Sequence, residues 1–217
     1  MKVALIGASG FVGATVLNEL ISRGHDVIAI ARNIEKIDAT SDKLTKVQAD
    51  VFDAAKLADI LQPADVVISA YNSGWTNPHI YDDFLKGAHA IQQAAKTAGN
   101  KRLIVIGGAG SLYIAEGVQL IDTPEFPEAF KPGASAAREY LNQLREEKEL
   151  PWTFLSPAIE MHHGIERKRT GTYRSGLENP VFNAEGRSWI TVDDLAVAIV
   201  DEAENAQHIQ QRFTVAY

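Results

Sequence analysis

The sequence predicts an α/β fold built on a doubly wound parallel sheet, and three observations predict it. Short apolar runs suited to buried strands recur at residues 3–6, 25–31, 44–49, 65–70 and 102–106. Apolar residues at helical spacing fill the intervals between these runs, and strands that alternate with helices indicate a parallel sheet covered on both faces. Three glycines, Gly7, Gly10 and Gly13, follow the first run at three-residue spacing.

The first strand, the glycines and the helix and strand after them form one βαβ unit over residues 2–33. Gly7 permits a tight turn off the strand, Gly10 lets the backbone approach a ligand, and Gly13 lets the helix pack close to the sheet. The helix N-terminus offers free N–H groups and the positive end of its dipole to an anion. This pattern is typical of a dinucleotide site, with a tight turn that binds nothing as the alternative. The predicted pyrophosphate contacts are Gly7, Ala8, Ser9, Gly10, Phe11, Val12 and Gly13.

The remaining elements are expected to complete one domain, residues 1–217. After a short helical segment behind Arg32, helices are expected at residues 53–61, 81–98 and 135–150, and a last helix begins with a capping pattern at Thr191 and Asp194. Loops are expected at 71–78 and 107–117, the second of them flexible. Residues 152–155 and 212–215 are predicted as strands. Residues 165–185 are predicted as short β-segments, so that the part from about 151 to 190 forms a small C-terminal region on the substrate side of the cleft.

Composition and charge exclude several classes of function. The chain is 46% hydrophobic and 23% charged, as in ordinary globular proteins. A net charge of −7 argues against a general nucleic-acid or anionic-membrane surface, and no apolar run reaches the ~20 residues that span a bilayer. Without cysteines there is no disulfide, thiolate nucleophile or iron–sulfur site. Residues 1–20 already belong to the first strand and helix rather than to a signal segment, so a cytoplasmic location is expected.

A metal site is not expected either. His162 and His163 are adjacent, and adjacent side chains point apart in an extended chain. No carboxylate or cysteine pattern with ligand spacing accompanies them.

The end of the second predicted strand distinguishes between the two nicotinamide cofactors. An acidic side chain there binds the ribose of NAD, whereas an arginine accommodates the extra phosphate of NADP. The chain has Arg32 and Asn33 at this position and no acid before Glu35, and a guanidinium is suited to phosphate. NADP is therefore preferred, with NAD possible, and the alternative for Arg32 is a solvated surface charge.

The ends of the third and fourth predicted strands supply further cofactor contacts. Asp50, followed by Val51, is placed to meet the adenine, or else is only an acid at a helix start. Ala70 and Tyr71 end the fourth strand, where the cofactor ribose should pass. Tyr71 is expected either to line the cleft or to pack beneath the following loop. In that loop, Trp75 and His79 form either an aromatic wall for a flat acceptor or ordinary packing.

Together with residues 7–31, four segments resemble the atypical short-chain dehydrogenase/reductases: GGAGSL (107–112), TFLSPA (153–158), TGTYRSG (170–176) and ITVDDLAVAIVDEAEN (190–205). The chain is most similar to the bacterial NAD(P)H-binding group named NADH-flavin reductases, and more distantly to biliverdin reductase B and NmrA-like proteins. The resemblance covers nearly the whole chain and implies a Rossmann fold. It also implies that Gly108, Ser156, Pro157 and Ala158 contact the cofactor, and that Ser111, with Tyr113 two residues on, lies near the nicotinamide.

The chain departs from the active dehydrogenases of this family. Those use a Tyr with a Lys four residues later, which lowers the pKa of the tyrosine for proton transfer. The residues four positions after the tyrosines are Trp75, Leu85, Gly117, Leu144 and Leu177, and Tyr217 is the last residue. Epimerase or alcohol dehydrogenase chemistry is therefore not expected. Ser111 and Tyr113 remain as hydrogen-bond donors to a substrate, or as hydroxyls that satisfy their own loop.

Two functions fit these observations. The first is an NAD(P)H-dependent reductase of a flat acceptor such as a quinone or a flavin (FMN or FAD), because a reduced flavin is a stabilised anion that solvent can protonate. The second is a redox sensor that binds NADP(H) without turnover, as NmrA-like proteins do. Both predict a small-molecule partner and the same cofactor site, and both leave monomer and homodimer open.

Overall fold

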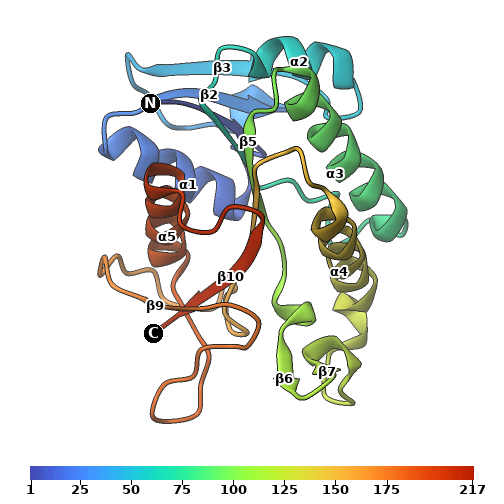
Figure 1. The fold of residues 1–217 in the computed structure, drawn as a ribbon. Helices are drawn as coiled ribbons and strands as arrows, with labels where there is room; N and C mark the ends of the chain where they lie inside the picture. The colour runs from blue at the N-terminus through green and yellow to red at the C-terminus, as the bar shows by residue number, and fades with distance from the viewer.

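An eight-stranded sheet forms the middle layer of the protein, in a computed structural model that describes residues 1–217 (Figure 1). The strand order is β3-β2-β1-β4-β5-β8-β10-β9, and every pairing is parallel except that of β9 with β10. In that order the strands are β3 (Leu44–Gln48), β2 (Asp26–Ala31), β1 (Lys2–Ile6), β4 (Val66–Ser69), β5 (Arg102–Ile106), β8 (Trp152–Ser156), β10 (Gln211–Ala216) and β9 (Arg174–Gly176). The predicted doubly wound Rossmann fold is confirmed.

Helices cover both faces of this sheet. They are α1 (Phe11–Ser22), α2 (Ala54–Leu61), α3 (Ile80–Thr97), α4 (Lys131–Glu146) and α5 (Val192–Asn205). Helices α1 and α5 lie side by side on one face, and α2, α3 and α4 lie along the other (Figure 1). None of the five combines the length and the apolar character needed to cross a membrane.

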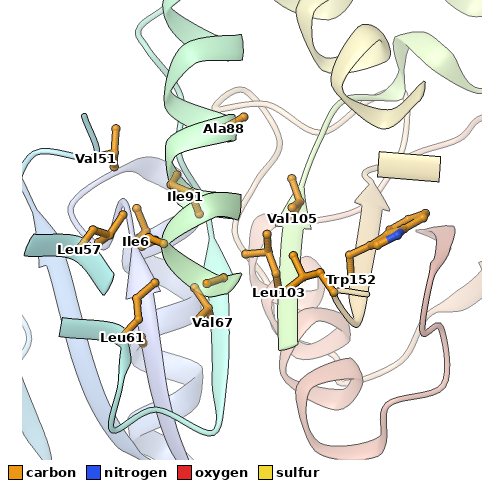
Figure 2. Packing of buried hydrophobic residues seen from close by; sticks show 14 of the residues in the cluster. Ile6, Val51, Leu57, Leu61, Val67, Ala88, Ile91, Leu103, Val105 and Trp152 are labelled. Carbon is orange, nitrogen blue, oxygen red and sulfur yellow. The ribbon is translucent and has the colours of Figure 1, made fainter. Parts of the chain in front are cut away.

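The core has two parts, one on each face of the sheet. Ile6 and Val67 point from the central strands toward Leu57 of α2 and Ile91 of α3 (Figure 2). The neighbouring strand residues Leu5 and Val66 belong to the other cluster, with α1 and α5. Central strands must therefore be apolar on both faces, which is why they appear in the sequence as continuous apolar runs rather than alternating ones.

The order of the strands determines where a ligand can bind. From β1 the chain moves outward to β2 and β3, and then crosses back to place β4 on the other side of β1. Ile6, at the end of β1, is paired with Ile30 of β2 and Ser69 of β4. In an open α/β sheet, ligands bind outside the carboxyl ends of the strands at such a reversal point. The crevice beyond Ile6 is therefore the expected site.

The segment 107–117, expected to be a flexible loop, is instead folded. It forms a 3₁₀ turn (Ala109–Ser111) and a hairpin of β6 (Tyr113–Ala115) with β7 (Val118–Gln119). Gly117 turns the hairpin at φ +70°, a conformation that favours glycine. Leu112 between the turn and the hairpin is fully buried. Gly117 therefore shapes the turn of this hairpin, and the segment has regular structure where a loop was expected.

Helix α4 begins and ends four residues earlier than the predicted 135–150. Pro132 lies in the first turn of α4, where a proline removes no intrahelical hydrogen bond. At the other end, the carboxylate of Glu147 accepts hydrogen bonds from the N–H groups of Glu149 and Leu150. These contacts turn the chain toward β8.

The C-terminal third also differs in detail from its prediction. Only β9 is a strand within residues 165–185. Thr191 caps α5 as expected, because its hydroxyl accepts from the N–H of Asp194. The carboxylate of Asp194 does not return to the cap, however. It accepts hydrogen bonds from Thr170, Gly171 and the hydroxyl of Tyr217, and so holds the irregular segment and the C-terminus against the start of α5.

Candidate functional site

The turn between β1 and α1 is built from close backbone contacts. Gly7 has φ +80°, and a Cβ atom there would lie 2.6 Å from the carbonyl oxygen of Ala70. A Cβ on Gly13 would lie 2.1 Å from the carbonyl oxygen of Gly7. Both distances are far below any allowed contact, so no larger residue fits at either place. The turn after β1 thus touches the end of β4, at the reversal point of the sheet.

Gly10 differs from these two glycines. Its φ of −83° and ψ of 172° are open to any residue, and a Cβ would meet only the Gly7 carbonyl oxygen, at 3.3 Å. The N–H groups of Ser9, Phe11 and Val12 donate to no group of the protein, and α1 has neither a side-chain cap nor an acid in its first turn. An open glycine beside free N–H donors fits a pyrophosphate. Ala8, in contrast, is buried in the core.

The residues after β2 are exposed. Arg32 forms no ion pair or hydrogen bond within the protein, so its guanidinium is available to a ligand. The side chain of Asn33 has a structural task, since its Oδ1 accepts from the N–H of Glu35 at 3.0 Å and caps the short 3₁₀ helix Ile34–Lys36. At this edge, therefore, Asn33 can contact a cofactor only through its backbone or through its side-chain NH2 group.

Asp50 and Val51, which follow β3, differ in exposure. Asp50 is exposed, and its Oδ1 accepts from the N–H of Phe52 at 3.0 Å. Val51 is buried in the core with α2. The carboxylate of Asp50 keeps its second oxygen for a ligand, whereas Val51 can offer only backbone.

Tyr71, after β4, packs against α3. Its hydroxyl donates to the carbonyl oxygen of Asp83 at 2.9 Å, and its ring stacks on Phe84 with centroids 6.0 Å apart. Burial raises the pKa of Tyr71 to about 12, with the Asp83 charge acting in the same direction. The ring of Tyr71 is half-buried. Most of it packs against α3, as one of the two expectations had it, and only its outer part is exposed. Ala70 is partly exposed beside it.

Ser111 lies at the carboxyl end of β5, almost fully buried. Its hydroxyl oxygen accepts a hydrogen bond from Nη1 of Arg212 at 3.3 Å, and the hydroxyl donates to no protein group. Tyr113 is engaged through its backbone with Glu178 and Asn179. Gly108 has nothing within 4 Å of an added Cβ, so space is open beside it. Ser111 therefore has one hydroxyl proton that is free to be donated.

Ser156 is the last residue of β8, Pro157 and Ala158 follow it, and all three are buried. Ser156 mirrors Ser111, because its hydroxyl also accepts from Nη1 of Arg212 at 3.3 Å and donates to no protein group. In the parallel sheet β8 is the neighbour of β5. The two serines therefore stand at adjacent strand ends and share one guanidinium.

Arg212 lies in the strand predicted over residues 212–215, but its role was not expected. Its side chain organises this side of the site. Its side chain is fully buried, its Nη2 forms an ion pair with Glu178, and its Nε has no partner. Burial alone would raise the pKa of Glu178, but Arg212 and Arg145 hold it below its usual range. The available signal was Arg212 as the one charged residue of the strand QRFTVA, since a buried charge requires partners.

The tyrosines are not arranged as proton donors. Tyr140, on α4, is fully buried among core residues, and its hydroxyl has no partner. Burial raises the pKa values of Tyr140, Tyr173 and Tyr217 as it does that of Tyr71. A tyrosine that transfers a proton near neutral pH needs the opposite shift. The shifts of these four groups agree with the missing Tyr–Lys pair.

The two adjacent histidines have separate contacts. The ring of His163 packs on Phe11 with centroids 3.8 Å apart, and Nδ1 of His162 accepts from the N–H of Gly164. No group of three or more metal-ligating side chains occurs in the structure. His163 thus brings the segment after β8 over the first residue of α1.

Comparison with known proteins agrees with this geometry. A sequence model of the family described as NAD(P)H-binding matches residues 7–206. The chain belongs to this NAD(P)H-binding family. The uncharacterized protein YwnB of Bacillus subtilis is 39% identical over 217 residues, which covers 99% of this chain and 98% of that protein.

Two solved structures are similar to this NAD(P)H-binding protein over their whole length. One, named a "putative epimerase", is from Bacteroides thetaiotaomicron, with 44% identity, a TM-score of 0.90, and coverage of 100% of this chain and 96% of that one. The other, named a "putative NADH-flavin reductase", is from Streptococcus pneumoniae, with 37% identity, a TM-score of 0.86, and coverage of 100% and 99%. The resemblance to this group, stated from the sequence, is confirmed.

The glycine turn gives the first prediction. Replacing Gly10 by Ala adds a methyl group whose one close protein contact is the Gly7 carbonyl oxygen, at 3.3 Å, on the side where we expect the pyrophosphate. We expect the melting temperature to stay close to that of the wild type, and NADPH binding to weaken about tenfold or more, since overpacking costs on the order of 1–3 kcal/mol. Circular dichroism melts and fluorescence titration with NADPH measure the two effects.

Gly13→Ala is the matched control for that variant. Its methyl group would lie 2.1 Å from a backbone oxygen, so this variant should lose stability as well as binding. A folded Gly10→Ala protein with wild-type NADPH affinity would contradict the assignment.

Proposed function

We propose that this protein is an NADPH-dependent reductase of a flat, conjugated acceptor such as a flavin or a quinone. The observation that carries the proposal is the pairing, at one edge of the sheet, of an open nucleotide turn with serine hydroxyls and no tuned proton donor. A Streptococcus pneumoniae relative that bears the name of a flavin reductase supports the same acceptor class. The proposal places the protein in the cytoplasm, where NADPH is regenerated.

The chain supplies binding and orientation in this proposal. Bound NADPH would supply a hydride, two electrons with one proton, and would leave as NADP⁺. The free N–H groups at Ser9, Phe11 and Val12 hold the pyrophosphate, and Arg32 meets the 2′-phosphate. Ser111 directs its free proton toward the acceptor, because Arg212 occupies its oxygen as a donor. The second proton that the reduced acceptor takes up comes from water, so no side chain has to change its protonation state.

The direct test of the proposal is steady-state oxidation of NADPH in the presence of FMN, FAD or menadione, with Gly10→Ala as the control for non-enzymatic transfer. We expect turnover that depends on the acceptor and that falls about tenfold in Gly10→Ala at NADPH concentrations below saturation. NADPH binding without turnover for every acceptor would instead support a redox sensor, which needs the same nucleotide turn but no acceptor site.

The cofactor preference is tested at Arg32. A charge-assisted contact with phosphate is worth about 1.5–3 kcal/mol, so Arg32→Ala should weaken NADPH binding by on the order of tenfold or more and leave NADH binding nearly unchanged. Lys36→Ala, another exposed cation of the same segment, is the control. Equal losses for NADPH and NADH would show that Arg32 does not contact the 2′-phosphate.

The role of Ser111 gives a prediction about the hydride step. One neutral hydrogen bond is worth about 0.5–1.5 kcal/mol, so Ser111→Ala should slow hydride transfer by about two- to tenfold, and Tyr113→Phe by less. Single-turnover kinetics with stereospecifically deuterated NADPH isolate this step, and a melting curve checks that Arg212 is still accommodated. A loss of three orders of magnitude would identify a true general acid and exclude protonation by solvent.

A further inference from the structure

The most exposed large apolar side chain of the protein lies in the loop that follows β4. Trp75 is 58% exposed and packs edge-to-face against Phe130, which is 48% exposed. Their ring centroids are 5.4 Å apart, and the ring planes are inclined at 77°. We call these two rings the aromatic corner. Two large rings left in water forgo the free energy that burial would provide, so their exposure calls for an occupant.

The aromatic corner rests on the first turn of helix α4. A Cβ on Gly133, in the first turn of α4, would lie 2.9 Å from ring atom Cζ3 of Trp75. The indole therefore rests directly on the helix backbone, where only glycine leaves room. The loop that carries it is also fixed, because Asn72 accepts from the N–H of Gly74 at 2.7 Å and Asn77 donates to Asp83 at 2.8 Å. Trp75 is thus exposed and held in position at the same time.

The aromatic corner and the turn that carries Ser111 both pack on the first turn of α4. The loop of Trp75 starts at Ala70 and Tyr71, beside the nucleotide turn. A Cβ on Gly110, in the turn that carries Ser111, would lie 3.1 Å from Cβ of Ala134. Trp75 and the Ser111 turn thus contact neighbouring residues of the first turn of α4. Figure 1 shows the start of α4 near the β6–β7 hairpin, at the end of the molecule where β10 also ends.

We propose that Trp75 and Phe130 bind the planar conjugated ring of the acceptor. This inference rests on the proposed function and names the residues that select its substrate class. Two rings at a steep angle offer one flat face for stacking and one ring for an edge contact, which is how aromatic groups prefer to pack. A flat heterocycle fills both contacts, whereas a saturated sugar or an aliphatic carbonyl compound fills neither. Stacking on an aromatic side chain does not require the hydrogen-bond pattern of one particular ring.

Steady-state kinetics of variants in which Trp75 or Phe130 is replaced test this inference. Trp75→Leu should raise the KM for FMN and for menadione by about tenfold, and Phe130→Leu by about threefold, because each removes one aromatic contact. Trp75→Phe should recover most of the loss. The dissociation constant of NADPH should change by less than about twofold in all three variants. Ile209→Ala, which removes an apolar side chain before β10 that is 42% exposed, should leave both quantities unchanged.

Tryptophan fluorescence gives a readout that does not depend on turnover. Of the three tryptophans, Trp152 is buried and Trp189 is partly buried against Tyr217, so the contribution of Trp75 is the difference between the wild type and Trp75→Phe. We expect saturable quenching in the wild type and its loss in Trp75→Phe, while Phe130→Leu shifts the same quenching to higher FMN concentration. If FMN binds with this pattern but no NADPH is oxidised, the aromatic corner stands and the reductase proposal fails.

Two results would overturn the inference. The first is an unchanged KM and unchanged FMN quenching in Trp75→Leu and Phe130→Leu, with both variants folded by circular dichroism. The second is a dimer in the wild type that becomes a monomer in these variants by light scattering, without any effect on the acceptor. That outcome would assign the aromatic corner to contact with a second copy of the chain.

Discussion

The close approach of helix α1 to the end of strand β1 is the constraint on which the rest of the structure depends. Gly13 allows the helix backbone to lie against Gly7, and Gly7 lies against the end of β4. This packing aims the free N–H groups of the helix at the crevice where the strand order reverses. Gly10 differs from the other two glycines, because its backbone hydrogen bonds to Gly7 and Ala14 do not require the missing side chain.

A buried guanidinium has the corresponding role in the second half of the chain. Arg212 joins the ends of β5 and β8 through Ser111 and Ser156, and reaches the segment after β9 through Glu178. The guanidinium is fully buried whereas the Glu178 side chain is 40% exposed, so loss of Glu178 would leave a buried charge without its counter-charge and destabilise the protein. The position of the Ser111 hydroxyl is therefore coupled to the stability of the C-terminal segments. Because the guanidinium donates to this hydroxyl, it also determines which way the hydroxyl proton points.

The first half of the fold was predictable from the sequence because its signals are local. Apolar runs, helical spacing and the glycine turn gave β1 to β5 and α1 to α3 within about two residues. The second half depends on contacts between distant segments, such as Asp194 with Thr170 and Glu178 with Arg212, which no local pattern reveals. The same limit applies to the site. Positions at strand ends could be listed in advance, but the packing of Tyr71 on α3 and the burial of Ser111 could not.

The two sides of the proposed site differ in whether backbone or side-chain groups form them. In the proposed function the nucleotide side is mainly backbone, with a turn, a helix end and two glycines without room for a side chain, and Arg32 is its one charged side chain. The proposed acceptor side is made of side chains, namely the serines that Arg212 contacts and the exposed rings of Trp75 and Phe130. Backbone geometry is shared by every chain with this fold, whereas side chains can differ from one relative to the next. Proteins of nearly the same shape can therefore bear names as different as epimerase and flavin reductase. The fold carries the cofactor, and the chemistry is decided by the few side chains on the other side of the crevice.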